Sequence, residues 1–179
     1  MRFQNKVVFI TGAARGIGKS FAEAFVKEGA KVVIADINIE DATKTAQEIG
    51  SNALAVKMDV TKQDSIDQAV NTAVDQLGGI DILINNAAIF TAAPITEIQR
   101  EDYQRVFDIN VSGTLFTLQA VAKKMIERGK GGKIISFHAR HEYLSTTSAA
   151  LLAVDEHGFI DGANINAKIM LNGLNLSHK

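Results

Sequence analysis

Residues 11–18, TGAARGIG, have the residue types and the spacing that bind a phosphate group. Gly12 can take a positive φ in a tight turn, Gly16 lets the backbone come close to a diphosphate, and Gly18 permits close packing of a helix on a strand. The helix that begins here presents free N–H groups and the positive end of its dipole to the ligand. The segment therefore predicts a site for a nucleotide diphosphate, although a glycine-rich turn can also serve only to turn the chain.

A carboxylate follows about twenty residues after these glycines, the interval at which an acidic side chain accepts hydrogen bonds from the ribose of adenosine. This residue is Asp36, at the end of the next apolar run. Its charge would repel a 2′-phosphate, which favours NAD over NADP, whereas Arg15 argues mildly for the opposite preference. Taken singly, Asp36 has the plain alternative of a solvated strand end. The combination of glycines and acid predicts a dinucleotide site.

The chain around these residues alternates short apolar runs with longer segments of helical period. The expected strands are 6–11, 31–36, 53–58, 80–86 and 132–137, and the expected helices are 17–28, 40–49, 64–77 and 98–127. Near-continuous apolar strands are buried on both faces, and connections of this length imply a parallel sheet with right-handed crossovers. We therefore predict an α/β fold, a Rossmann-type doubly wound parallel sheet in three αβα layers.

The pattern changes after Phe137. All four histidines follow this residue, and strands no longer alternate clearly with helices. We therefore divide the chain into a dinucleotide-binding core, residues 1–137, and a divergent tail, residues 138–179. Within the tail, TSAALLAV (147–154) suggests a helix and ANINAKIML (163–171) suggests a strand. The edge strand of the sheet would be open to pairing with another chain unless this tail covers it.

Length, charge and composition narrow the function classes. The 179 residues suit one domain, and 19 Lys and Arg against 20 Asp and Glu provide no basic surface for nucleic acid. The absence of cysteine excludes disulfides and thiolate metal sites and is typical of a reducing compartment. No stretch approaches the ~18 apolar residues of a membrane span, and no signal-peptide pattern begins the chain. We expect a cytoplasmic protein whose partners are small molecules or other proteins, with no nucleic acid and no membrane.

Four motifs together resemble the short-chain dehydrogenase/reductase family. They are TGxxxGxG at 11–18, MDV at 58–60, INNAA at 84–88 and FDINVSGT at 107–114. The resemblance covers the chain from about Phe3 to Phe137, and LINNAAIFTAAPI, EDYQRVFDINVSGTLF and GGKII are most similar to the polyol, or sorbitol-type, branch. It implies an NAD cofactor and the transfer of hydride between NAD and a polyol or its ketose.

The resemblance also implies roles for individual residues. Asp59 and Val60 would flank the adenine ring, and Asn86, Ala87 and Ala88 would line the ribose side of the cofactor cleft. The expected cofactor-binding residues are thus Gly12, Arg15, Gly16, Ile17, Gly18, Asp36, Asp59, Val60, Asn86, Ala87 and Ala88. The alternatives are an ordinary cap for Asp59 and loop hydrogen bonds for Asn86.

Of the catalytic residues that the family implies, the asparagine has a counterpart in this sequence, Asn110. By the resemblance, it would hold a water molecule in the proton relay. Asparagine is a poor helix former that tends to disrupt or kink a turn, so its place inside the long helical segment 98–127 favours a functional role.

The groups that would complete proton transfer are not at their expected positions. In the family a tyrosine supplies the proton, a lysine four residues later on the same helix face lowers its pKa, and a serine about a dozen residues earlier holds the substrate. This sequence has no Tyr-x-x-x-Lys at Tyr103 or Tyr143. Alignment through GGKII brings Ala139, Leu152 and Glu156 to the positions of the serine, tyrosine and lysine.

Two histidines near the expected active site invite another interpretation. His138 and His141, with Glu142, suggest a replacement base or a metal site. Their spacing matches neither the His-x-x-x-His nor the Cys/His pattern of zinc sites, so we expect no metal.

We therefore expect an NAD-binding chain that resembles polyol oxidoreductases and is impaired in turnover, because loss of a positioned acid and base costs ~10²–10⁴-fold. Whether it is an NAD-dependent oxidoreductase in its own right stays open. One alternative is a catalytically inactive partner that forms a homo- or hetero-oligomer through the helix at 98–127. The other is a truncated or frame-shifted fragment of an intact dehydrogenase, or the product of an alternative exon.

Overall fold

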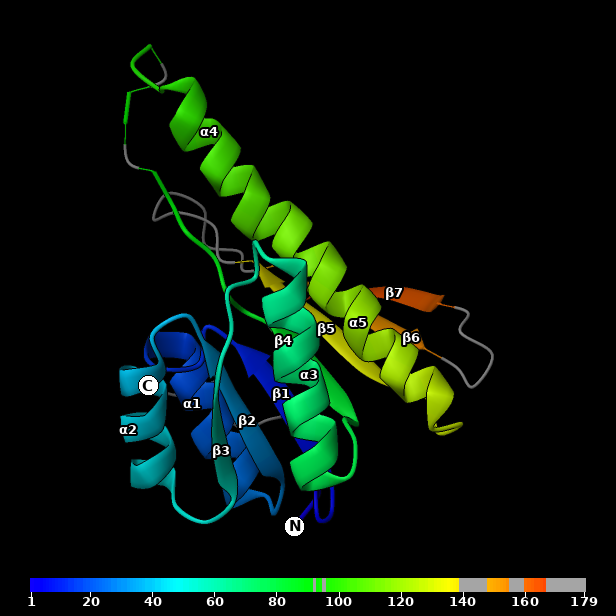
Figure 1. Ribbon diagram of the computed structural model, residues 1–179. Helices are drawn as coiled ribbons and strands as arrows, with labels where there is room; N and C mark the ends of the chain where they lie inside the picture. The colour runs from blue at the N-terminus through cyan, green and yellow to red at the C-terminus, as the bar shows by residue number, and fades with distance from the viewer. Residues whose placement is uncertain (92, 95, 139–147, 155–159, 167–179) are drawn as a thin grey trace.

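A computed structural model describes residues 1–91, 93–94, 96–138, 148–154 and 160–166 (Figure 1). For residues 138, 148–154 and 160–166 only the backbone is described. Within the described residues, no helix has both the length and the apolar character needed to cross a bilayer.

Parallel strands form the centre of the molecule, as predicted. They are β1 (Val7–Thr11), β2 (Lys31–Asp36), β3 (Ala53–Lys57), β4 (Ile82–Asn85) and β5 (Gly132–His138). These strands pair in the order β3-β2-β1-β4-β5, so that the direction of winding reverses between β1 and β4. This confirms the doubly wound sheet and locates its switch point.

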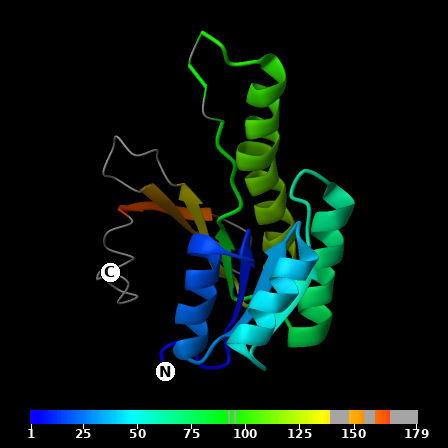
Figure 2. The ribbon, with the colours of Figure 1, turned by 90° about the vertical axis from the view of Figure 1, so that its left-hand side faces the viewer.

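Helices cover both faces of the sheet (Figures 1 and 2). α1 (Gly16–Lys27) and α2 (Ile39–Ile49) lie on one face, and α3 (Gln63–Leu77) and α5 (Thr114–Glu127) lie on the other. Successive strand side chains point to opposite faces. In β1, Phe9 therefore packs in the core with α3 and α5, whereas Val8 and Ile10 pack with α1 and α2. Burial on both faces explains why these strands are almost entirely apolar.

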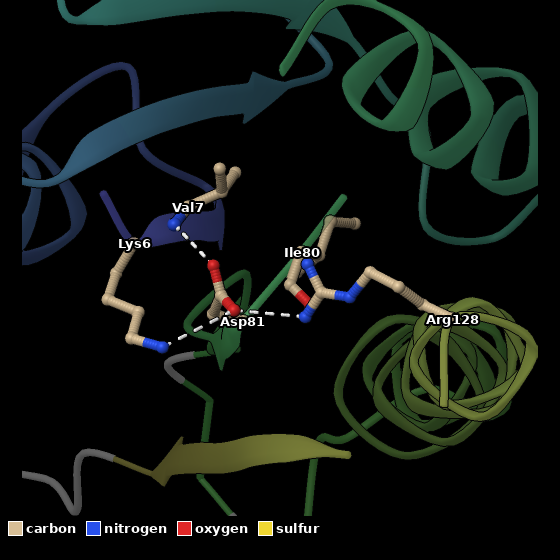
Figure 3. A network of polar contacts seen from close by, with 5 residues as sticks. All are labelled: Lys6, Val7, Ile80, Asp81 and Arg128. Carbon is tan, nitrogen blue, oxygen red and sulfur yellow. Dashed lines mark hydrogen bonds and ion pairs between the residues drawn. The ribbon is translucent and has the colours of Figure 1, made fainter. Parts of the chain in front are cut away.

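A polar network fixes the amino-terminal ends of β1 and β4 (Figure 3). Asp81 Oδ2 accepts a hydrogen bond from the Val7 N–H at 2.9 Å, and Asp81 Oδ1 accepts one from Arg128 Nη2 at 2.9 Å. The same guanidinium nitrogen donates to the Ile80 carbonyl at 3.0 Å, and the Lys6 ammonium lies 3.8 Å from Asp81. The network joins the amino-terminal ends of both central strands to the end of α5.

The predicted helix at 98–127 consists of three parts. α4 (Arg100–Phe107) is followed by a π-helical segment, η1 (Asp108–Gly113), and then by α5. The helix begins at Arg100, two residues later than predicted. None of the α4 residues is buried, and α4 extends beyond the sheet in Figures 1 and 2. Asn110 lies inside the π-helical segment, so the expected disruption occurs as one widened stretch within a continuous helix.

The backbone of the tail adds antiparallel strands to the sheet. β6 (Ser148–Val154) pairs with β5, and β7 (Ile160–Asn166) pairs with β6. The predicted helix at 147–154 is therefore wrong over 148–154, because pairing with the open N–H and C=O groups of β5 outweighs the local helix preference. The edge of β5 is covered. The strand predicted at 163–171 is confirmed over 163–166, and its remainder lies outside the described residues.

Candidate nucleotide-binding site

The carboxyl ends of β1, β2, β3 and β4 surround a pocket of about 350 Å³ at the point where the strand order reverses. Such switch points are where doubly wound sheets bind ligands. Many of the predicted cofactor-binding residues line this pocket: Gly12, Arg15, Asp36, Asp59, Val60, Asn86, Ala87 and Ala88. The fold thus brings together residues from four separate loops.

The glycines of the first turn differ in what surrounds them. Gly12 has φ +64°, and a Cβ there would lie 2.9 Å from the Cα of Ala87. Gly16 has φ +58° at the first residue of α1, and a Cβ there would meet nothing within 4 Å. A Cβ on Gly18 would collide with the Gly12 carbonyl oxygen and lie 2.7 Å from Asn86 Nδ2. Gly18 therefore permits close packing beneath the pocket, whereas Gly16 lies beside open space.

Hydrogen bonds tie the turn after β1 to the loop after β4. Thr11 Oγ1 accepts from the N–H groups of Asn86 and Ala87, both at 3.0 Å. Asn86 Nδ2 donates to the carbonyl oxygens of Thr11 and Gly12, also at 3.0 Å. Asn86 therefore makes the loop hydrogen bonds that were its alternative role, and it lines the pocket as well.

Asp36 accepts hydrogen bonds from the turn after β1 and from the loop after β2. Its Oδ2 accepts from the Ala14 N–H and its Oδ1 from the Asn38 N–H, both at 3.1 Å. Because an ionised carboxylate offers about four acceptor positions, two remain for a ligand in the pocket. Arg15, the N-cap residue of α1, lines the same pocket. The carboxylate that would repel a 2′-phosphate and the cation that would attract one thus line the same pocket.

Asp59 organises the loop between β3 and α3. Its Oδ1 accepts from the Thr61 hydroxyl at 2.7 Å and from the Thr61 N–H at 3.0 Å, and Lys62 Nζ lies 3.5 Å from its Oδ2. The hydroxyl hydrogen bond is the main cause that lowers the pKa of Asp59 below its ordinary value of 3.8, and partial burial opposes it. Asp59 is therefore anionic at neutral pH and stabilises a loop turn, while Lys62 is the N-cap residue of α3.

Sequence reasoning missed the apolar part of this pocket. The additional lining residues are Ala35, Ile37, Met58, Ile89 and Ile109. Ile37 is 63% exposed, and a large apolar side chain directly after a strand-ending aspartate is the signal that could have identified it. Gly113 was also missed: a Cβ there would lie 2.8 Å from Cγ2 of Val60, so glycine lets η1 pack against the Val60 wall.

A second pocket, of about 590 Å³, adjoins the first and shares Asn86, Ala88 and Ile89 with it. Ile17 and Asn110 line this second pocket rather than the first. Asn110 Oδ1 accepts from the Ile89 N–H, and Asn110 Nδ2 donates to the Ile89 carbonyl, both at 2.9 Å. The π-helical segment thus holds the loop that separates the two pockets.

Most of the residues considered for acid–base chemistry lie outside the residues that the structure describes. Outside the described residues lie Ala139, His141, Glu142, Tyr143 and Glu156. His138 belongs to β5 and Leu152 to β6, where the backbone of Leu152 pairs with Ile134. Among the described side chains, no group of three His, Cys, Asp or Glu residues is arranged to hold a metal ion.

The family model of the short chain dehydrogenase matches residues 6–143. The chain belongs to the short-chain dehydrogenase/reductase family. It is 52% identical to a sorbitol dehydrogenase of Cereibacter sphaeroides, and the alignment covers 93% of this chain and 70% of the relative. It is 49% identical to a galactitol 2-dehydrogenase of Agrobacterium fabrum, with the same coverage of 93% and 70%. The similarity to the polyol branch is thereby confirmed.

Solved structures of short-chain dehydrogenases/reductases share the fold. A 3-ketoacyl-(acyl-carrier-protein) reductase from Brucella melitensis, complexed with NADH, has a TM-score of 0.68 at 38% identity over 71% of this chain and 53% of that chain. A short-chain type dehydrogenase/reductase from Mycobacterium marinum has a TM-score of 0.75 at 34% identity over 82% of this chain and 62% of that one. This chain thus spans less than two thirds of either solved chain.

Proposed function

We propose that this short-chain dehydrogenase/reductase chain binds a nicotinamide dinucleotide, with NAD preferred over NADP. The observation that carries the proposal is that the glycine turn, Asp36 and the Asn86 loop converge on one pocket at the switch point of the sheet. The reductase from Brucella melitensis, 38% identical, is complexed with NADH, which supports the same class of ligand here.

Each part of the dinucleotide has a proposed partner in this chain. The diphosphate would lie at the start of α1, beside Gly16, where the helix offers free N–H groups. The adenosine ribose would bind Asp36, and the adenine would lie between Val60 and the apolar residues around Ile37. The nicotinamide end would point toward the second pocket, past the Ile89 loop. The proposed part of Asn110 is to fix that loop through its two hydrogen bonds to Ile89.

We propose a polyol or ketose as the substrate class and impaired turnover by this chain. Sorbitol and galactitol 2-dehydrogenases are among its relatives, which supports the substrate class. NAD, when bound, supplies the hydride acceptor, but oxidation of an alcohol also releases a proton from its hydroxyl. The 179 residues contain no Tyr-x-x-x-Lys pair to take up that proton. The binding of nucleotide is therefore the part of the family's activity that this chain retains in our proposal.

The test separates binding from turnover. On titration with the protein, NADH fluorescence should rise to saturation, and excess ADP should reverse the rise. With NAD and sorbitol, NADH formation should be at least ~10²-fold slower than with the Cereibacter sphaeroides enzyme at equal concentration. A flat fluorescence titration would refute nucleotide binding, and turnover at the rate of the relative would refute the impairment.

A second candidate function is that of an interaction partner, forming a homo- or hetero-oligomer. A line of exposed apolar side chains on α4, η1 and α5 favours it, and we call this line the apolar stripe. Its members are between 42% and 56% exposed: Tyr103, Phe107, Val111, Leu115 and Phe116. Four of them recur every four residues, the spacing of neighbours on a helix, and exposed apolar patches are typical of protein interaction sites.

A further inference from the structure

The peptide groups of Ala14 are held on both sides by residues outside the turn. The Ala14 N–H donates to Asp36 Oδ2 at 3.1 Å. The Ala14 carbonyl accepts from the hydroxyl of Thr45 at 2.6 Å, and Thr45 lies on α2, thirty-one residues along the chain. Both residues are buried, with 6% of Ala14 and 3% of Thr45 exposed. Ala14 thus attaches the turn between β1 and α1 to β2 and α2.

The hydrogen bond of Thr45 differs from the usual one of a helical threonine. Such hydroxyls commonly donate to the carbonyl four residues earlier in their own helix. Thr72 on α3 does this, with its hydroxyl 2.8 Å from the Gln68 carbonyl. Thr45 instead donates across to the turn. Because the Ala14 carbonyl is buried, removing this donor would leave an acceptor without a partner, which is a costly arrangement.

The position of the next residues depends on this attachment. Arg15 has extended backbone angles, φ −156° and ψ 176°, and Gly16 then begins α1 at φ +58°. A rotation of the Ala14–Arg15 peptide would change the direction in which the first N–H groups of α1 point. Those groups are the ones that a helix start leaves without partners inside the helix. By fixing the Ala14 carbonyl, the hydroxyl of Thr45 holds the peptide that leads into these groups.

We propose that Thr45 is a positioning residue for the diphosphate of the bound nucleotide, an inference that rests on the proposed function. Thr45 does not line the pocket and touches no part of a ligand. It acts by fixing the Ala14 peptide, so that the amides at the start of α1 are ready for the phosphates before binding. The contribution belongs to phosphate recognition and not to recognition of adenine or ribose.

Two probes with and without phosphate test this assignment. ADP and adenosine compete with NADH in the fluorescence assay, and their affinities are compared in the wild type and in Thr45→Val, which keeps the side-chain shape and loses the hydroxyl. We expect the affinity for ADP to fall roughly 5- to 20-fold and that for adenosine to change by less than about twofold. Thr45→Ser, which keeps the donor, should restore ADP affinity to within about twofold of the wild type.

Matched controls separate positioning from a general loss of stability. Thr72→Val removes a helical hydroxyl far from the turn and should leave the ratio of ADP to adenosine affinity unchanged. If Thr45→Val does not fold, Thr45→Ala provides the same comparison. An unchanged ratio in the folded variant would overturn the role of Thr45 while NADH binding stands. Failure of the wild type to bind NADH or ADP would overturn the proposed function itself.

Discussion

Among single residues, Asp36 both holds backbone groups and lines the proposed nucleotide pocket. Its two oxygens accept hydrogen bonds from the backbone N–H groups of Ala14 and Asn38, and its side chain lines the same pocket as Arg15. We propose that a 2′-phosphate in this pocket would meet both the anion and the cation, and that the balance between these two side chains sets the preference between NAD and NADP.

Replacing Asp36 should change that preference. In Asp36→Ala, and also in Asp36→Asn, the ratio of NADP to NAD dissociation constants should fall roughly tenfold, because the repulsion of the 2′-phosphate is removed. Asp36→Asn keeps an acceptor oxygen, so it separates the charge from the hydrogen bond to Ala14. Both ratios come from competition with NADH. An unchanged ratio in both variants would count against the assignment of Asp36.

The sequence predicts some of these residues well and others not at all. Gly12 could be predicted because positive φ and close approach are properties of glycine itself, visible in the spacing of the motif. Thr45 could not be predicted, because nothing local distinguishes it from Thr72. Which carbonyl a buried hydroxyl reaches depends on how α2 packs beside the turn, and that is a property of the assembled fold.

Among the secondary-structure elements, the π-helical segment η1 connects the helix to the site. Asn110 makes two hydrogen bonds from η1 to the backbone of Ile89, and Gly113 lets the same segment approach Val60. Both contacts reach loops that line the proposed nucleotide pocket. A widened turn thus positions two pocket walls from one element, in line with the frequent occurrence of π-helical turns at functional sites.

Removal of the Asn110 side chain should destabilise the fold although it improves local helix propensity. Asn110→Ala leaves the partly buried N–H and C=O of Ile89 without their partners, so we expect the free energy of unfolding to fall by ~1–3 kcal/mol in urea denaturation. Asn71→Ala is the matched control, because Asn71 is exposed on α3. This substitution should raise the free energy of unfolding by roughly a few tenths of a kcal/mol, since alanine is the better helix former. Equal effects of the two substitutions would contradict the role of Asn110 in holding the backbone of Ile89.

Periodicity predicted most helices and strands to within a residue or two, because each buries an apolar face that repeats with its own period. It could not predict β6, where alanine and leucine favour a helix locally. The backbone there pairs with β5, a non-local partner. It could not predict the extent of η1 either, since Asn110 marks a disturbance without fixing how many residues change their hydrogen-bonding pattern.

At the scale of the whole molecule, the helix formed by α4, η1 and α5 is buried at one end and exposed at the other. α5 packs on the sheet through Val121 and Met125, whereas α4 has no buried residue. The apolar stripe runs from Tyr103 on α4 to Phe116 on α5. The α4 part of this helix extends beyond the sheet in Figures 1 and 2. Water in contact with such a surface is unfavourable, so covering it is a driving force for association.

Sedimentation velocity should therefore detect species larger than the 19.3 kDa chain at micromolar concentration. Leu115→Glu introduces a charge in the middle of the apolar stripe, at a side chain that is 56% exposed, and should shift the protein toward the monomer. Because burying an unpaired carboxylate is costly, we expect the association constant to fall by at least roughly tenfold. Gln47→Glu, at an exposed position of α2 on the opposite face of the sheet, adds the same charge and should leave association unchanged. A wild type that sediments as a monomer, or a Leu115→Glu variant that associates as strongly as the wild type, would remove the apolar stripe as an interface. NADH binding should persist in both variants, since neither residue lines the nucleotide pocket.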